Sequence, residues 1–334
     1  MKKASPSHGL AVAVVDPTTL LGRDVRSVLK ERTFPAARVL LFHSSSAHAG
    51  LLTTDDDEAA FVAPLTPDAL EPAGIAFLCG KAADSERFLS QRAADDCLAI
   101  DLSGVRSGGT FAVPSKGPSG QALPEGNLFL TYDPVAAVLA DAVRIVDTLS
   151  PVSGATVAVD RPASELGRAA LDELFQQAIS LARFQSLPKE VFETQAVFNA
   201  FFPADTDAFN ARVAEDVTRL LGRSLPLSLL SVRSGVFHGH LLRLELRIDG
   251  TAPVAESLRV AFQKSGAFEE TDPESLAGPV EAAGRDETLL LYAASSGSVI
   301  RLGLAADHLR RTGAVMGVRL AEQAVKERGL LADA

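Results

Sequence analysis

The sequence is poor in the residues that build cross-linked or metal-centred proteins. Its 334 residues include two cysteines, two methionines, two tyrosines and no tryptophan. Two thiols, Cys79 and Cys97, exclude a disulfide framework and a four-thiolate zinc site. The six histidines show no metal-ligand spacing; His238 and His240 have no acidic or thiolate residue close by in sequence. We therefore expect no metal site.

Positive charge and long apolar runs are also scarce. Acidic residues outnumber basic ones by 42 to 32, giving a net charge of −10, and no Lys/Arg run is present. Such a charge repels phosphate backbones and anionic lipid, so neither nucleic acid nor membrane is an expected partner. The apolar stretch at 10–15 ends at Asp16, too short for a signal peptide or for the ~18 residues of a membrane span. We expect a cytoplasmic protein, and the acidic run 55–58 predicts a solvated loop.

The first part of the chain alternates apolar strands with helical patterns. The first strand leads through a turn at 16–19 into a helix with apolar residues on one face. Such alternation predicts βαβ units and a parallel sheet, hence a Rossmann-like α/β domain. The predicted buried strands are Leu10–Val15, Val39–Phe42, Ile75–Leu78 and Leu98–Leu102. The Gly-, Ser- and Pro-rich stretch 104–126 predicts an irregular connection.

The later part is richer in strands that follow one another directly. A helix is predicted from Pro134, a strand at 156–159, a helix at 165–182 and a C-terminal helix at 307–328. Further strands are predicted at Leu229–Val232, Leu241–Ile248 and Leu289–Tyr292. These features predict an α+β domain with a mixed or antiparallel sheet, one face of which packs on a partner or on its own helices. We expect a first domain of 1–133 with the C-terminal helix 310–334, and a second of 134–309.

The N-terminal turn has the position of a dinucleotide site but little of its chemistry. A strand, turn and helix place amides at a pyrophosphate, and glycines let the backbone approach it. Here Gly22 ends the turn, while Asp16 and Thr19 occupy the two earlier glycine places and Asp16 adds a carboxylate. We expect a scaffold without tight cofactor binding, NAD or NADP being the weak candidate. Its contacts would be Thr18, Thr19, Leu20, Leu21 and Gly22.

The stretch 12–38, with Arg32-Thr33-Phe34-Pro35, resembles the opening of the aspartate-semialdehyde dehydrogenase family. Further matches, in order, are Ile100-Asp101-Leu102-Ser103, Gly126-Asn127-Leu128, Phe198-Asn199, Arg233 with His240, and Ala306-Asp307-His308-Leu309-Arg310. The sequence is more similar to the divergent semialdehyde-dehydrogenase-like branch than to the biosynthetic enzymes. The resemblance implies a Rossmann-like domain joined to a dimerisation and substrate domain, and therefore a homodimer.

The family's nucleophile has no counterpart in this sequence. The family reduces an acyl phosphate with NADPH through a thioester on a cysteine in an Asn-Pro-Asn-Cys-Ser-Thr run that opens a helix. The run aligns with 131–136 and places Pro134 at the cysteine. From the residues themselves, Asp133 is a good N-cap and Pro134 a good first helical residue. The helix start is kept, but proline can neither attack a carbonyl nor hold an acyl group.

Other family positions are altered as well. The resemblance places the glutamine that assists the thiol at Arg161 and the Ser-Gly-Ala-Gly phosphate loop at 164–167, where Glu165 disfavours an anion and Gly167 is kept. The loop for the NADP 2′-phosphate resembles 43–46, with Ser44 but without an arginine, so NADP preference is not supported. The stretch 209–222 lacks a convincing match to the family's acidic residue and lysine for substrate.

Two functional positions persist, each with a structural alternative. The resemblance makes Arg233 the substrate-carboxylate arginine and His240 the general base. Alternatively, Arg233 forms an ion pair between strands and His240 is a hydrogen-bonded histidine near the sheet. Cys79 would be a replacement thiol at the end of the third strand, but a buried cysteine is the commoner role.

Three hypotheses follow. The first is a dimeric protein without the family's reaction, acting as a scaffold or binding a partner or a small carboxylate ligand. The second is an NAD(P)-dependent oxidoreductase on another carbonyl compound, with His240 as acid/base and Arg233 holding a carboxylate. The third is a small-anion sensor that keeps the Arg233 region.

Overall fold

The structure is a computed structural model that describes residues 9–45, 50, 52–55, 58–92, 97–114, 122–272 and 276–330. These residues form two compact units. The first unit holds the described residues up to 114, with 122–132 and 313–330. The second holds the described residues of 133–312. Among the described residues, no helix has the length and apolarity needed to cross a bilayer.

The first unit is built on a seven-stranded parallel sheet, as predicted. In spatial order its strands are β5 (Ala63–Pro64), β2 (Arg38–His43), β1 (Ala11–Val15), β6 (Ile75–Leu78), β7 (Leu98–Asp101), β9 (Leu128–Leu130) and β8 (Thr110–Phe111). The four predicted strands are confirmed to within two residues at either end. The predicted irregular connection contains the short strand β8, and its residues 115–121 lie outside the described part.

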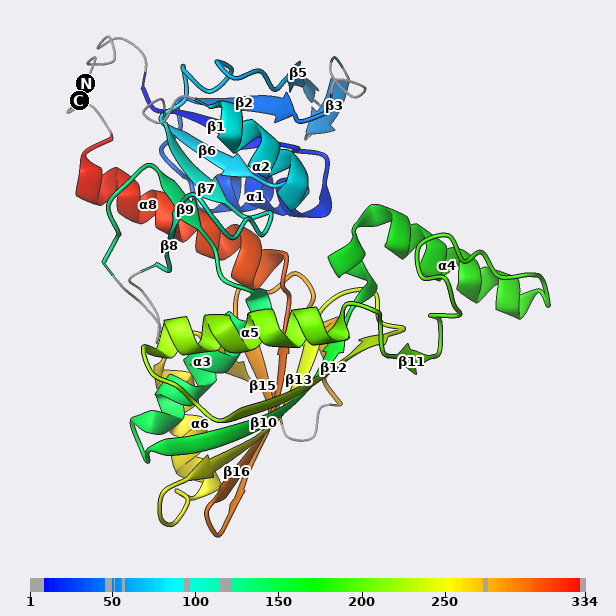
Figure 1. Cartoon of the computed structure of the whole chain (residues 1–334), viewed down its shortest axis with the longest axis vertical. Coiled ribbons are helices and arrows are strands. Elements are labelled where there is room, and N and C mark those ends of the chain that lie inside the picture. The colour runs from blue at the N-terminus through cyan, green and yellow to red at the C-terminus, as the bar shows by residue number, and fades with distance from the viewer. Residues whose placement is uncertain are drawn as a thin grey trace. The chain divides into compact units, whose positions relative to one another are not determined.

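Helices cover both faces of this sheet, which explains its continuous apolar strands. They are α1 (Leu20–Glu31), α2 (Ala82–Gln91) and α8 (Met316–Arg328). In β1, Val12 and Val14 join a core cluster with residues of α1 and α8, whereas Ala13 and Val15 join a second cluster with Phe88 of α2. The C-terminal helix therefore completes the core of the N-terminal sheet (Figure 1).

The acidic run is not the loop that its charge predicted. A small antiparallel pair, β3 (Leu52–Asp55) and β4 (Glu58–Phe61), includes both ends of the run, and residues 56 and 57 lie outside the described part. The prediction was wrong for these two ends, because charge along a run does not by itself distinguish a loop from a strand.

The second unit contains the predicted mixed sheet, also of seven strands. In spatial order these are β11 (Ala200–Phe201), β12 (Leu227–Ser234), β10 (Val152–Arg161), β13 (His240–Ile248), β16 (Val299–Ala306), β15 (Thr288–Ser296) and β14 (Phe268–Glu270). The pairs β10–β12 and β14–β15 are parallel and the others antiparallel. Strand β16 was missed in the sequence, and β10 and β15 are longer than predicted.

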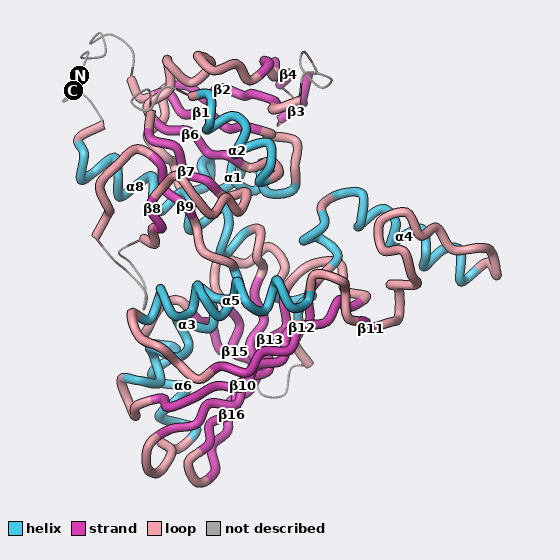
Figure 2. The backbone as a smooth tube through the Cα atoms, in the orientation of Figure 1, coloured by secondary structure: helices cyan, strands magenta, loops and turns pink. Residues whose placement is uncertain are grey.

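One face of this sheet is covered by its own helices. Helices α3 (Pro134–Asp147), α5 (Thr206–Leu221) and α6 (Ala255–Lys264) pack on β10, β12 and β15 (Figure 2). In β13, Leu242, Leu244 and Leu246 are buried, whereas Arg243 and Arg247 are exposed. The apolar alternation of that strand is therefore satisfied within the unit. A short helix, α7 (Pro279–Ala282), lies further along the chain.

An arm leaves the sheet after β10. It consists of a 3₁₀ turn, η2 (Ala163–Leu166), then α4 (Arg168–Ala182) and an irregular segment that returns to β11 (Figure 1). The single helix predicted at 165–182 is thus broken at Gly167, whose φ of +85° suits glycine. The C-terminal helix is interrupted too, since a π-helical segment, η3 (Arg310–Val315), precedes α8.

Candidate functional site

The start of α3 is closed by the chain's own carboxylate. Asp133 is the N-cap and Pro134 the first helical residue, as predicted. Asp133 Oδ1 accepts a hydrogen bond from the Val135 amide at 2.9 Å, and its Oδ2 lies 3.2 Å from Arg212 Nε. Burial raises the pKa of Asp133, while Arg212 opposes that rise. No thiol stands at this helix start. The amide of Val135, which has no partner within the helix, is already hydrogen-bonded to Asp133.

A second carboxylate, that of Glu165, contacts both Arg233 and His240. Arg161 ends β10, Arg233 lies opposite it in β12, and His240 opens β13. Glu165 Oε2 accepts from Arg161 Nε at 2.8 Å and from Arg233 Nη1 at 2.9 Å. Glu165 Oε1 lies 2.6 Å from His240 Nε2. We call these four residues the Glu165 cluster.

Burial and charge make this cluster strongly coupled. Arg161, Arg233 and His240 are 4%, 2% and 3% exposed, whereas the Glu165 side chain is 14% exposed. Burial alone raises the pKa of Glu165, but the hydrogen bond and charge of His240, with the two arginines, hold it far below its ordinary value. Burial lowers the pKa of Arg233. Arg233 does form an ion pair, but its partner Glu165 lies in the 3₁₀ turn η2 and not in a strand, so the predicted pairing between strands is not what forms.

Two further residues border the cluster. Asp205 binds the outer edge of Arg161 through two bonds of 3.0 and 2.9 Å. The His308 ring lies edge-on to His240, with 4.9 Å between the centroids. Neither ring nitrogen of His308 has a hydrogen-bond partner among the described residues. Burial, followed by the charge of His240, lowers the pKa of His308 to about 4. His308 belongs to the motif 306–310 that resembles the family, but the sequence indicated no role for it.

The nucleotide-type turn of the first unit also contains a carboxylate. Asp16 follows β1 with a φ of +59°. Its Oδ1 accepts from the amide and the hydroxyl of Ser44, at 2.9 and 3.0 Å, just after β2. A Cβ on Gly80, just past β6, would lie 2.0 Å from Asp16 Oδ2. The carboxylate thus lies where the carboxyl ends of three strands meet, the usual ligand position in open α/β sheets.

The other predicted cofactor residues divide between the units. Thr19 caps α1 by accepting from the Gly22 amide at 3.0 Å, and Gly22 allows a close approach, since a Cβ there would meet Asp16 O at 2.3 Å. Leu20 and Leu21 form the first turn of α1, and Thr18 directly precedes the cap. Gly167 belongs to the second unit, between η2 and α4.

The cysteines are buried and do not form a nucleophilic site. Cys79 is 2% exposed, and burial, with Asp16 and Asp101, raises the pKa of its thiol. A thiol rather than a thiolate is a poor nucleophile. Cys97 is 5% exposed at the start of β7. Within the described residues, no three His, Cys, Asp or Glu side chains gather in a way that could hold a metal ion.

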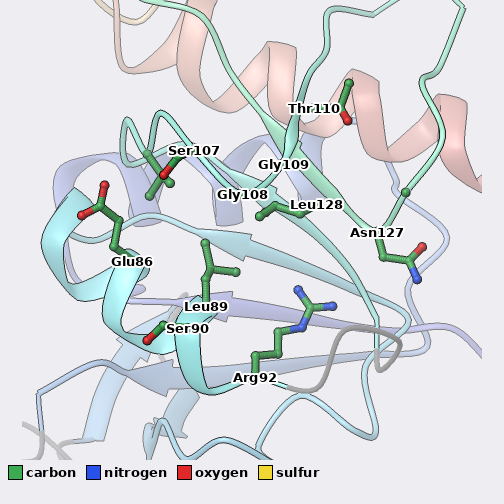
Figure 3. Close-up of a pocket in the computed structure, with 12 residues that line it drawn as sticks. Glu86, Leu89, Ser90, Arg92, Ser107, Gly108, Gly109, Thr110, Asn127 and Leu128 are labelled. Atoms are coloured by element: carbon green, nitrogen blue, oxygen red, sulfur yellow. The ribbon is translucent and has the colours of Figure 1, made fainter.

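The first unit also has a cavity of about 590 Å³ beside α2. Figure 3 shows Leu89 of α2 and Arg92, the residue after that helix, facing the loop at Gly108 and Gly109 and the start of β9 at Leu128. None of the predicted site residues lines this cavity. It is therefore separate from both carboxylate sites.

Comparison with known proteins finds aspartate-semialdehyde dehydrogenases similar to this chain over nearly its whole length. No family model matches it. Aspartate-semialdehyde dehydrogenase of Rickettsia conorii is 25% identical over 94% of this chain and 97% of its own length, and that of Aquifex aeolicus is 24% identical over 96% and 99%. A "USG-1 protein homolog" of Azotobacter vinelandii is 24% identical over 96% and 99%.

Solved structures share the whole architecture. A probable aspartate-semialdehyde dehydrogenase from Pseudomonas aeruginosa matches with a TM-score of 0.82 at 24% identity, covering 96% of this chain and 99% of that one. Aspartate semialdehyde dehydrogenase II from Vibrio cholerae matches with a TM-score of 0.83 at 19% identity and the same coverage. The fold is that of a Rossmann-like domain joined to a mixed-sheet domain. The chain is similar to aspartate-semialdehyde dehydrogenases at low identity over nearly its whole length, which confirms the resemblance seen in its motifs.

Proposed function

We propose that this chain is an aspartate-semialdehyde-dehydrogenase-like protein without the family's reaction, acting as a dimeric scaffold or as a binding protein for a ligand or partner. The observation that carries the proposal is Pro134 at the first position of α3, with Asp133 bonded to the next amide. A thioester needs a thiolate at this helix start, where amides and the helix dipole stabilise negative charge. Here the sulfur is replaced by a proline ring and the amide is already used.

The turn of the first unit supports the same proposal for the cofactor. A dinucleotide brings its pyrophosphate to the N-terminus of the first helix of such a fold. In this chain the Asp16 carboxylate is fixed beside that position by Ser44. Repulsion between carboxylate and phosphate disfavours NAD and NADP.

A turnover assay tests the proposal. Purified full-length protein is incubated with aspartate semialdehyde, phosphate and NAD or NADP, and reduced cofactor is followed. We expect no rate above the enzyme-free blank, since deleting a catalytic nucleophile costs on the order of 10⁶ in turnover. A rate that scales with protein concentration overturns the proposal.

The Pro134→Cys variant serves as the matched control. We expect it to remain inactive, because Asp133 still occupies the Val135 amide and Glu165 still binds Arg233 and His240. If the new thiol alone produced turnover, Pro134 would be the sole defect and the remaining site would be intact.

The alternative oxidoreductase function would use the same two residues. Arg233 and His240 do lie together, but Glu165 bonds both, so a substrate carboxylate and a reacting carbonyl must first displace it. Two hypotheses therefore stay predictions: an oxidoreductase on another carbonyl compound, and an anion sensor. Both require Glu165 to leave Arg233 and His240. A thermal-shift screen with dicarboxylates and acyl phosphates tests the sensor.

For the assembly we propose a homodimer in the cytoplasm, with the arm at its interface. The arm carries exposed apolar side chains: Leu166, Phe175, Phe184, Phe198 and Phe202. Phe184 and Phe198 are 99% and 84% exposed. Exposed aromatic groups of this kind mark interaction surfaces in soluble proteins. Both cysteines are free and buried, which suits a reducing compartment.

A further inference from the structure

We propose that Glu165 is a built-in ligand: its side chain occupies a carboxylate-binding site formed by Arg161, Arg233 and His240. The proposal deepens the proposed function, on which it rests, by naming what fills this site and which molecules compete for it. The ligand class is a small monocarboxylate, the size of acetate or propionate.

The three side chains that bind Glu165 come from separate strands and point at one carboxylate. Arg161 ends β10, Arg233 is the last but one residue of β12, and His240 begins β13; β10 lies between the other two strands in the sheet. All three are at least nine-tenths buried. Burying such charges is costly unless an anion pairs with them. The sheet therefore presents a preformed anion site whether or not position 165 supplies the anion.

Glu165 itself does not belong to the sheet. It lies in η2, the short 3₁₀ turn that follows β10, and η2 is followed by Gly167 with its positive φ. Its side chain is the most exposed of the cluster, at 14%. Glu165 thus reaches the three sheet residues from the outside, where a free anion would also enter.

The bonding pattern defines the size and charge of the ligand. One carboxylate oxygen receives both arginines and the other faces His240. Arg233 Nη1 also donates to the Pro162 carbonyl at 2.6 Å, which fixes its position independently of Glu165. Truncation at position 165 to alanine would leave space for the missing carboxymethyl group, which acetate replaces atom for atom.

The test is chemical rescue of the Glu165→Ala variant. Its melting temperature is measured in rising sodium acetate at constant ionic strength, with acetamide as the neutral isostere. We expect acetate to raise the melting temperature of the variant to a plateau. The acetate concentration needed should be at least about tenfold lower than for any rise in wild type. Acetamide should produce no such rise. Equal responses to acetate and acetamide, or equal responses of variant and wild type, overturn the proposal.

Two further variants complete the experiment. Asp172→Ala removes a surface carboxylate that pairs with Arg168 on α4, and it should show no acetate response. Glu165→Ala combined with Arg233→Met should lose the response of Glu165→Ala. If Glu165→Ala is unfolded in buffer, recovery of its circular dichroism by acetate but not by acetamide is the readout, and no recovery overturns the proposal.

The rescue and the turnover assay fail independently. Rescue without turnover supports both proposals. Turnover in wild type overturns the proposed function. The acetate experiment then still decides the built-in ligand by itself: rescue supports it and no rescue overturns it. Absent turnover together with absent rescue overturns the built-in ligand alone.

Discussion

At the residue scale, three carboxylates occupy positions where a semialdehyde dehydrogenase would bind negative charge. Asp133 holds the amide at the start of α3, Asp16 lies at the nucleotide turn, and Glu165 binds Arg233 and His240. Each carboxylate is hydrogen-bonded, so each is compatible with a stable fold. In the proposed function, each of them takes the place of an external anion.

Replacing Asp133 by alanine should destabilise the protein by about 1–2 kcal/mol, because the cap bond to Val135 is lost. Asp133→Asn should retain most of the stability, since its side-chain oxygen still accepts that bond. Denaturant unfolding of both variants measures the difference. Equal losses in the two would show that the charge, through Arg212, matters more than the cap.

His308 should make stability depend on pH above the range of the carboxylates. Its pKa is about 4 in the fold, against an ordinary value near 6.5. As pH falls through this window, the unfolded chain takes up a proton that the folded chain refuses, so the free energy of unfolding declines. Glu165 acts in the same direction but only below about pH 4.3, because its pKa is lowered and its stabilisation, complete above the unfolded value, is lost as pH falls further.

The His308→Phe variant isolates this effect. Phenylalanine keeps a ring against His240 and removes two buried nitrogens that have no partner among the described residues. The decline in melting temperature between pH 6.5 and pH 4.5 should become smaller than in wild type. An unchanged profile would assign the decline to other groups.

At the element scale, side chains of α4 hold the irregular segment of the arm in place. Glu173 accepts from the amides of residues 190, 191 and 192 at 2.8, 2.6 and 3.1 Å. Gln177 bonds the carbonyls of Pro188 and Thr194 and the amides of Ala196 and Val197. The segment therefore has fixed backbone partners without belonging to a helix or sheet.

Replacing Gln177 by leucine should loosen this segment more than the rest of the molecule. Four backbone groups lose a partner, and buried unpaired groups cost about 1–3 kcal/mol each when water cannot replace the bond. Hydrogen exchange should rise by at least about tenfold at Ala196 and Val197. The exposed neighbour variant Gln176→Leu should leave exchange there unchanged.

The sequence predicted elements whose patterning is strong and missed those that depend on context. Buried strands β1, β6 and β7 have continuous apolar runs, and Asp133-Pro134 marks a helix start by capping chemistry alone. Helix α5 was missed although Phe209, Val213, Val217 and Leu220 repeat at helical spacing. In the site, the sequence predicted Arg233 and His240 as candidate residues. Their bonds to Glu165 could not be predicted, because they depend on how η2 folds back to the sheet and the residues are far apart in sequence.

At the scale of the whole molecule, two units, each with its own core, have the architecture of aspartate-semialdehyde dehydrogenase structures, whereas the proposed function lacks their reaction. The first unit is covered on both sheet faces, and the second on one. The arm adds aromatic surface that no part of the described chain covers. Stability and assembly can thus persist independently of turnover.

Sedimentation velocity should show a dimer at micromolar concentration. Phe184→Ser with Phe198→Ser should weaken dimerisation by at least about tenfold, because both side chains are exposed in the single chain and aromatic anchors dominate interfaces. Phe61→Ser, at an exposed residue of β4 in the first unit, is the control and should leave dimerisation unchanged. A monomeric wild-type protein would contradict the proposed homodimer and, with it, the role of the arm as its interface.

Titration of the wild-type protein with NADH and with NADPH tests most directly whether the fold has lost the family's chemistry, because the family reaction and the alternative reduction each require one of these cofactors. With Asp16 fixed at the nucleotide turn, isothermal calorimetry should show no saturable binding up to about 1 mM, a concentration that detects even −4 kcal/mol of affinity. Saturable binding with a micromolar Kd would contradict the account, since it would mean that the turn accepts a diphosphate despite its own carboxylate.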